Sequence, residues 1–142
     1  METTQIELTD KFALATAITI YDNDETFSFS KGDDKFESVL SSLNLITQNS
    51  HEMPGFAVSL DNETKQAIQS GRWLELEFKK TQKYNDMPFD SLLIEVSKDY
   101  SGFNLIRKTN GKYEGRCFYL NLSQNMQPLY DTIESIIRWT IF

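Results

Sequence analysis

The sequence predicts a single α+β domain, a largely antiparallel sheet with helices packed mainly on one face. Several segments alternate between apolar and polar residues, which is the period of a β-strand with one buried face. Other segments repeat apolar residues every three or four positions, as amphipathic helices do. Strands and helices do not alternate strictly along the chain, which argues against a doubly wound parallel sheet.

The chain is expected to begin with a β-hairpin and a helix. Residues 12–21 and 26–30 alternate as two strands around a polar turn. Asp34 and Glu37 then have the spacing of a helix capping box. Apolar residues follow at helical spacing, so a helix is predicted over residues 35–47.

Shorter elements are expected next. Residues 51–55 contain proline and glycine and are predicted to form a loop, and residues 56–60 a short strand. A short, mostly polar helix is expected to open at Ser59 or Asp61 and to close at Gly71.

The strand predicted over residues 72–79 has the clearest alternation in the chain. It places Leu74, Leu76 and Phe78 inward and Trp73, Glu75 and Glu77 outward, on a face expected to be wet. Residues 80–90 are predicted to form a loop. A further strand over residues 92–96 is expected to turn Glu95 outward.

Asn110 and Gly111 separate two alternating runs, residues 103–109 and 112–122, and this dipeptide is typical of a two-residue hairpin turn. The predicted register places Thr109 opposite Lys112, pairs Arg107 with Glu114, and puts Arg116 beside them. Tyr113, Tyr119 and Lys108 then project from the other face. The final helix is expected to open near Ser123 and Pro128.

Composition limits the classes of function. The 142 residues carry a net charge of −7, which argues against a nucleic-acid partner because phosphate binding requires clustered lysine and arginine. Cys117 is the only cysteine, so no internal disulfide can form and the expected location is the cytoplasm. No apolar run is long enough to suggest a membrane protein. Residues 1–142 are expected to form one domain.

Candidate chemistry is sparse. Cys117 and His51 are the only available cysteine–histidine pairing, and a mid-strand cysteine is more often an inert small apolar residue. Glu75, Glu77 and Glu95 could line one face as catalytic carboxylates, but outward glutamates usually only face solvent. The usual zinc, calcium and phosphate-binding patterns are absent. We therefore expect no catalytic residue, no metal and no cofactor, and favour a protein that is not an enzyme.

Two surface features remain as candidates for binding. The first is a protein-binding surface of aromatic and arginine side chains, the types that concentrate binding energy at interfaces. Its predicted members are Trp73, Arg107, Tyr113, Arg116 and Tyr119. The structural alternative is a solvated salt bridge beside tyrosines packed beneath a helix. The second is the apolar tail, residues 138–142, which is expected to pack on the sheet of its own chain or to form a homodimer.

These features favour a non-catalytic protein-binding module, of the inhibitor or immunity type, that regulates a more basic partner. The alternative is a small-ligand-binding protein or enzyme with a pocket between the helices and the sheet. That pocket would contain Glu75, Glu77 and Glu95, or Arg107 and Arg116.

Overall fold

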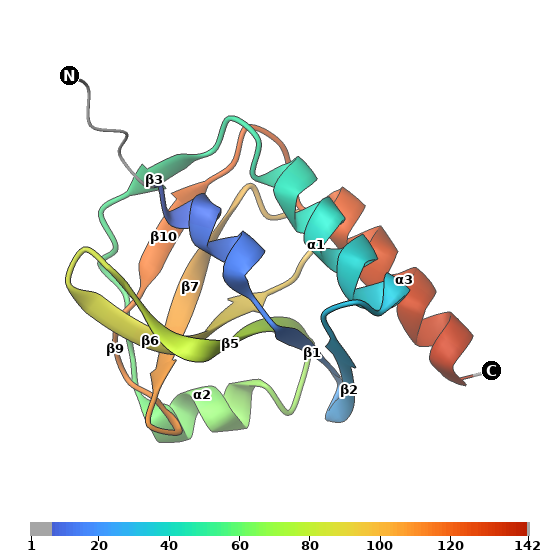
Figure 1. The fold of residues 1–142 in the computed structure, drawn as a ribbon, viewed down its shortest axis with the longest axis horizontal. Helices are drawn as coiled ribbons and strands as arrows, with labels where there is room; N and C mark the ends of the chain where they lie inside the picture. The colour runs from blue at the N-terminus through green and yellow to red at the C-terminus, as the bar shows by residue number, and fades with distance from the viewer. Residues whose placement is uncertain (1–6, 142) are drawn as a thin grey trace.

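The structure is a computed structural model that describes residues 7–141 of the chain (Figure 1). Within these residues, ten strands and four helical segments form one α+β domain, as predicted. In chain order the elements are η1 (Leu8–Leu14), β1 (Ala17–Asp22), β2 (Glu25–Ser30), α1 (Asp34–Ile46), β3 (His51–Met53), β4 (Val58–Ser59), α2 (Asp61–Ala67), β5 (Arg72–Tyr84), β6 (Met87–Glu95), β7 (Gly102–Thr109), β8 (Lys112–Tyr113), β9 (Gly115–Arg116), β10 (Phe118–Asn121) and α3 (Gln127–Ile141).

The strands form one large sheet and one small one. The large sheet has eight strands in the order β2-β1-β5-β6-β7-β10-β3, with β8 paired to β7. The small sheet consists of β4 and β9. Every strand pair is antiparallel, which confirms the predicted sheet type.

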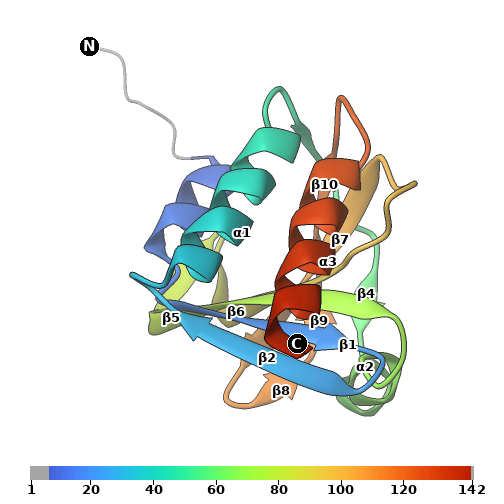
Figure 2. The ribbon, with the colours of Figure 1, turned by 90° about the vertical axis from the view of Figure 1, so that its right-hand side faces the viewer.

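The main core lies between one face of the large sheet and the helices α1, α3 and η1. Helices α1 and α3 lie side by side over this face (Figure 2). Alternate residues of the strands, such as Ile18 and Leu76, are fully buried against apolar residues of the helices, such as Leu43 and Ile133. Helix α1 begins one residue earlier than predicted because Asp33 is its N-cap and accepts a hydrogen bond from the Lys35 amide at 2.8 Å.

Helix α2 lies against the opposite face of the sheet, which we call the outer face. It covers a second, smaller apolar cluster centred on Trp73, Leu93 and Tyr113, with Ile68 packed against it. Trp73 points outward from the main core, as predicted, but only 8 % of it is exposed because α2 covers it. The expectation that this face is wet is therefore wrong for the part beneath α2.

The first predicted strand is wrong over its first half. Residues 12–14 belong to the 3-10 helix η1, and β1 begins at Ala17. The alternation suggested that Phe12 and Leu14 share a face, but Phe12 is fully buried while Leu14 is 50 % exposed. Leu8 and Phe12 are the buried residues of η1, and both pack into the main core.

The predicted loop at residues 80–90 is also wrong, because β5 and β6 continue through it as a long hairpin. Asn85 and Asp86 both have positive φ angles, 49° and 61°, which fits the tight turn that joins twisted strands. Phe89 lies in this region and is fully buried. Its ring packs edge-on against Phe78 and Phe118 at centroid distances of 5.4 and 5.9 Å.

Three smaller differences concern element ends. The predicted loop at residues 51–55 contains the edge strand β3, which pairs with β10. The strand predicted over residues 56–60 is reduced to Val58–Ser59, which pairs with β9. The final helix begins at Gln127, one residue before the predicted Pro128.

Candidate interaction surface on the outer face

The predicted hairpin register holds at the turn and then breaks. Thr109 pairs with Lys112 as predicted, but Leu105 pairs with Phe118, two residues beyond the position that an uninterrupted hairpin would give. The intervening residues leave β7 and form β9. The predicted Arg107–Glu114 pair is therefore wrong, because this shift removes the two residues from opposite positions.

The two predicted arginines have different roles. Arg107 donates through Nε to the carbonyl oxygen of Arg116 at 2.8 Å and through Nη1 to that of Pro88 at 2.7 Å. It therefore ties β7 to neighbouring backbone. The side chain of Arg116 is exposed, and its residue lies opposite Val58 in the small sheet. Of the two, Arg116 is the one a partner could reach.

The tyrosines of the predicted surface also differ. Tyr113 is 2 % exposed and packs with Trp73 beneath α2, which is the structural alternative stated above. The ammonium of Lys108 lies 5.0 Å from the centre of its ring. Tyr119 is half-buried on the outer face, opposite Asn104. Only Tyr119 is therefore available at the surface.

Glu75 is buried at the centre of the outer face. It is 1 % exposed, and three hydroxyl groups donate hydrogen bonds to its carboxylate. The Tyr21 hydroxyl lies 2.7 Å from Oε1, the Ser91 hydroxyl 2.5 Å from Oε2, and the Tyr113 hydroxyl 2.9 Å from both oxygens. These donors replace the water that an exposed carboxylate would bind. Glu75 was expected to be solvated, and this expectation is wrong.

The three glutamates on this face do not form a catalytic pair. Glu77 is half-buried two residues from Glu75, and its pKa is raised, first by burial and then by the charge of Glu75. Glu95 is exposed and accepts a hydrogen bond from the Tyr100 hydroxyl at 3.2 Å. Because Glu75 is enclosed and Glu95 is bound elsewhere, the arrangement offers no accessible pair of carboxylates to a substrate.

The hydroxyls of Tyr21, Ser91 and Tyr113 that donate to Glu75, which we call the hydroxyl network, make the protein sensitive to alkali. Burial, followed by the charge of Glu75, raises the pKa of both Tyr21 and Tyr113 far above the ordinary value of 10.0. The unfolded tyrosines release their protons near pH 10 while the folded ones retain them. Their contribution to stability is therefore complete below that pH and is lost as the pH rises toward the folded pKa.

We expect the free energy of unfolding, measured with urea between about pH 8 and pH 11, to fall above about pH 10. In Tyr113→Phe this fall should be shallower, because the substitution removes one of the tyrosines whose pKa is raised by burial and by Glu75. Trp139→Phe replaces an exposed aromatic side chain that does not titrate, so it is the control and should retain the wild-type slope. Equal slopes in all three proteins would contradict the assignment of the alkaline loss of stability to Tyr21 and Tyr113.

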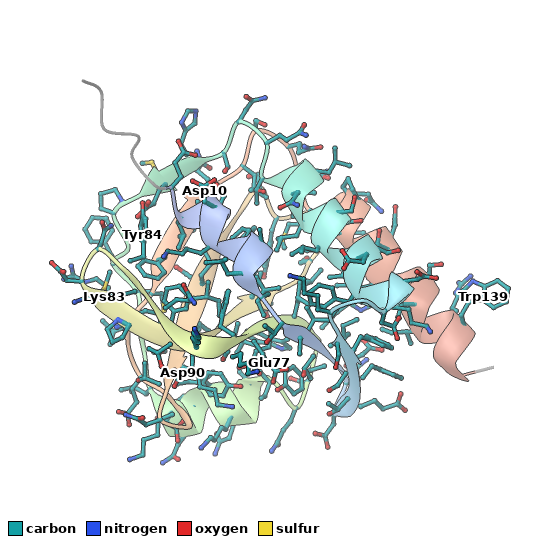
Figure 3. The ribbon with its side chains drawn as sticks, in the orientation of Figure 1. Asp10, Glu77, Lys83, Tyr84, Asp90 and Trp139 are labelled. Atoms are coloured by element: carbon teal, nitrogen blue, oxygen red, sulfur yellow. The ribbon has the colours of Figure 1, made fainter. Side chains whose placement is uncertain are left out.

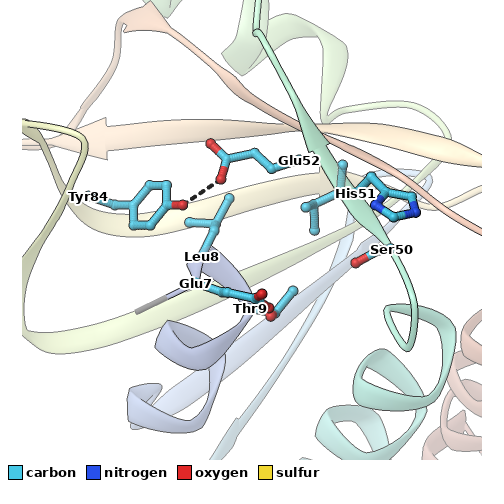
Figure 4. Close-up of a pocket in the computed structure, with 8 residues that line it drawn as sticks. Glu7, Leu8, Thr9, Ser50, His51, Glu52 and Tyr84 are labelled. Carbon is cyan, nitrogen blue, oxygen red and sulfur yellow. Dashed lines mark hydrogen bonds between the residues drawn. The ribbon is translucent and has the colours of Figure 1, made fainter. Parts of the chain in front are cut away.

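His51 lies beside a small polar pocket of about 270 Å³ (Figure 4). Within it, the Tyr84 hydroxyl donates to Glu52 at 2.5 Å, and burial and this carboxylate raise the pKa of Tyr84 to about 12. The His51 ring points away from this pair (Figure 4). Residue 51 pairs with Asn121, at the opposite end of β10 from Cys117, whose thiol is buried and has a raised pKa because of that burial. The structure therefore does not join His51 and Cys117 into a catalytic pair.

A run of exposed apolar residues crosses the outer face between β3 and α2. We call its four large members the apolar ledge: Met53, Phe56, Val58 and Leu60, with exposed fractions of 47, 90, 65 and 59 %. Four such residues in eight positions exceed the scattered apolar exposure of an ordinary surface. Sequence reasoning identified this segment only as a loop and short strand and did not select it as a site.

The backbone holds the ledge close to the sheet. The Cys117 amide donates to the carbonyl oxygen of Ala57 at 3.0 Å. A β-carbon built on Gly55 would lie 2.1 Å from the carbonyl oxygen of Cys117, so only glycine allows the chain to pass there. The ledge is therefore held against β10, and its side chains face solvent.

Two shallow apolar grooves flank the ledge. The first, the α2 groove, has a volume of about 400 Å³ and lies between α2 and the sheet. It is lined by Ala57, Val58, Ser59, Leu60, Glu63, Thr64, Ala67, Trp73, Asn104, Ile106 and Cys117. The second, the β10 groove, has a volume of about 450 Å³. It is lined by Met53, Pro54, Phe56, Ala57, Asn104, Tyr119 and Asn121.

The end of α3 forms a separate exposed site. Trp139 is 79 % exposed and projects away from the rest of the molecule (Figure 3). The expectation that the tail packs back on its own sheet is wrong for Trp139. The side chains of Thr140, Ile141 and Phe142 are outside the part of the chain that the structure describes, so their predicted contacts stay predictions.

Residues 7–141 contain no group of three or more histidine, cysteine or acidic side chains placed to hold a metal ion. None of the helices described is both long and apolar enough to cross a membrane. The chain matches no protein-family model, no curated protein and no solved structure.

Proposed function

We propose that this protein is a non-catalytic protein-binding module of a reducing compartment, the cytoplasm, and that the apolar ledge is its docking surface. The observation that carries the proposal is the exposure of four large apolar side chains between two apolar grooves. Burying a side chain such as Phe56 against a partner contributes about 1.5–3 kcal/mol. Tyr119 lines one groove, and Arg116 lies opposite Val58, so two residues of the sequence-predicted surface adjoin the ledge.

Two observations favour binding over catalysis. The titratable groups that an enzyme would use are enclosed or separated, as Glu75, Cys117 and His51 illustrate. The space between the helices and the sheet, where the alternative pocket was expected, is filled by fully buried side chains such as Leu76 and Leu129. The outer face is therefore the best supported place for a ligand.

The net charge of −7 supports a partner with basic groups, because opposite charge accelerates encounter and disfavours acidic competitors. An inhibitor or immunity-type regulator of a basic protein fits this description. A nucleic acid or a membrane fits it poorly, since both present negative charge.

The test is affinity capture from the source cells, followed by titration calorimetry with the purified captured protein. We expect Phe56→Ser to weaken the complex at least about tenfold, because a central aromatic anchor is lost. Trp139→Ser removes another largely exposed aromatic, at the end of α3, and should leave affinity unchanged. The reverse pattern would contradict the proposal, as would a homodimer that Phe56→Ser dissociates.

A further inference from the structure

The two grooves can be filled by one ligand because they share a wall. Ala57 and Asn104 line both of them. The Asn104 side chain is exposed and makes no hydrogen bond within residues 7–141. Its amide carries both donors and an acceptor, so it can bind the N–H and C=O of another chain.

The shape of the surface selects an extended ligand over a helical one. The chain crosses the sheet at Ala57 and divides the surface into two grooves, whereas an amphipathic helix fills one continuous trough with a long stripe of side chains. An extended segment places every second side chain on the same side, about 7 Å apart. Two such side chains could enter the two grooves while the backbone between them passes Asn104.

The charge of the groove residues adds a third requirement for the ligand. Glu63 is the only charged residue that lines the α2 groove, and the residues lining the β10 groove are all uncharged. The Glu63 side chain is exposed and forms no ion pair within the described part of the chain. An apolar segment that carries lysine or arginine next to its apolar residues would satisfy this carboxylate.

We propose that the ligand of the ledge is an extended segment of a basic protein, with two apolar side chains two positions apart and a basic residue next to them. This inference rests on the proposed function and specifies the partner. The apolar side chains occupy the α2 and β10 grooves, the Asn104 amide binds the backbone between them, and Glu63 pairs with the basic residue.

The probe is a capped peptide, Lys-Leu-Thr-Leu-Lys, in which the charges are symmetric so that its direction on the surface is immaterial. The matched control, Lys-Leu-Leu-Thr-Lys, has the same composition but turns its leucines to opposite sides. Trp139→Phe leaves Trp73 as the single tryptophan, and Trp73 lines the α2 groove. Binding is then followed by Trp73 fluorescence and by amide chemical shifts of 15N-labelled protein.

We expect saturable shifts at Ala57, Asn104 and Trp73, and about tenfold weaker binding of the control peptide because one leucine loses its groove. Glu63→Gln should weaken the binding of the first peptide about threefold, as for an exposed ion pair. Glu37→Gln, on α1, is the matched control and should have no effect. Equal binding of both peptides, shifts elsewhere, or no saturation would overturn the inference.

Failure of the inference can be separated from failure of the proposed function. If neither peptide binds but a captured protein still depends on Phe56, the ledge is a docking surface and only the extended-segment ligand is wrong. If the captured protein also binds Phe56→Ser as tightly as wild type, the proposed function itself is wrong.

Discussion

Replacement of Glu75 by alanine is expected to lower the free energy of unfolding by about 3–5 kcal/mol. The carboxylate is enclosed, and it is the shared acceptor for the hydroxyls of Tyr21, Ser91 and Tyr113. Its removal leaves these donors without an acceptor and opens a cavity on β5 beside the side chains of Tyr21, Ser91 and Tyr113. Urea unfolding at neutral pH measures the loss.

Glu77→Ala is the matched control because Glu77 lies on the same strand and the same face. Its raised pKa means that the folded chain disfavours its charge, so this substitution should change stability by less than about 1 kcal/mol. In Glu75→Leu, adding Tyr113→Phe should restore part of the lost stability, since the unmatched donor is removed with its acceptor. Equal losses in the two alanine variants would show that the hydroxyl network does not stabilise the fold.

Phe89→Ala is expected to cost about 3–5 kcal/mol, because it deletes a fully buried ring that contacts Phe78 and Phe118. These contacts join the β5–β6 hairpin to β10. Denaturant unfolding monitored by circular dichroism measures the effect. Phe56→Ala is the matched control, since Phe56 is 90 % exposed, and should change stability by no more than about 0.5 kcal/mol. A small effect of Phe89→Ala would contradict the packing of the long hairpin.

The elements that sequence predicted well are those whose signal is local. The stripe of Phe36, Val39, Leu43 and Ile46 lies within one helix, and all four are buried as the spacing requires. The Asn110-Gly111 turn depends only on two positive φ angles that these residues adopt readily. Such signals need no knowledge of the rest of the chain.

The misplaced residues depend on contacts between distant segments. Glu75 has the alternation of a solvated strand residue, and its burial requires Tyr21, 54 residues away, and Tyr113, 38 residues away. Residues 80–90 are polar enough to resemble a loop because much of the hairpin tip faces solvent. The apolar ledge was missed for the opposite reason, since apolar residues such as Phe56 are ordinarily expected to be buried.

The pairing of β3 with β10 has a consequence for synthesis of the chain. Met53 pairs with Tyr119, so the edge strand β3, which carries the first residue of the ledge, has no strand partner until 66 further residues (119 − 53) have been made. At about 5–20 residues per second, this interval lasts roughly 3–13 s. Throughout it, the nascent chain displays Phe56 and its apolar neighbours beside an unpaired backbone edge, the combination that promotes aggregation. We therefore expect the growing polypeptide to depend on a chaperone during the seconds before its last strand emerges.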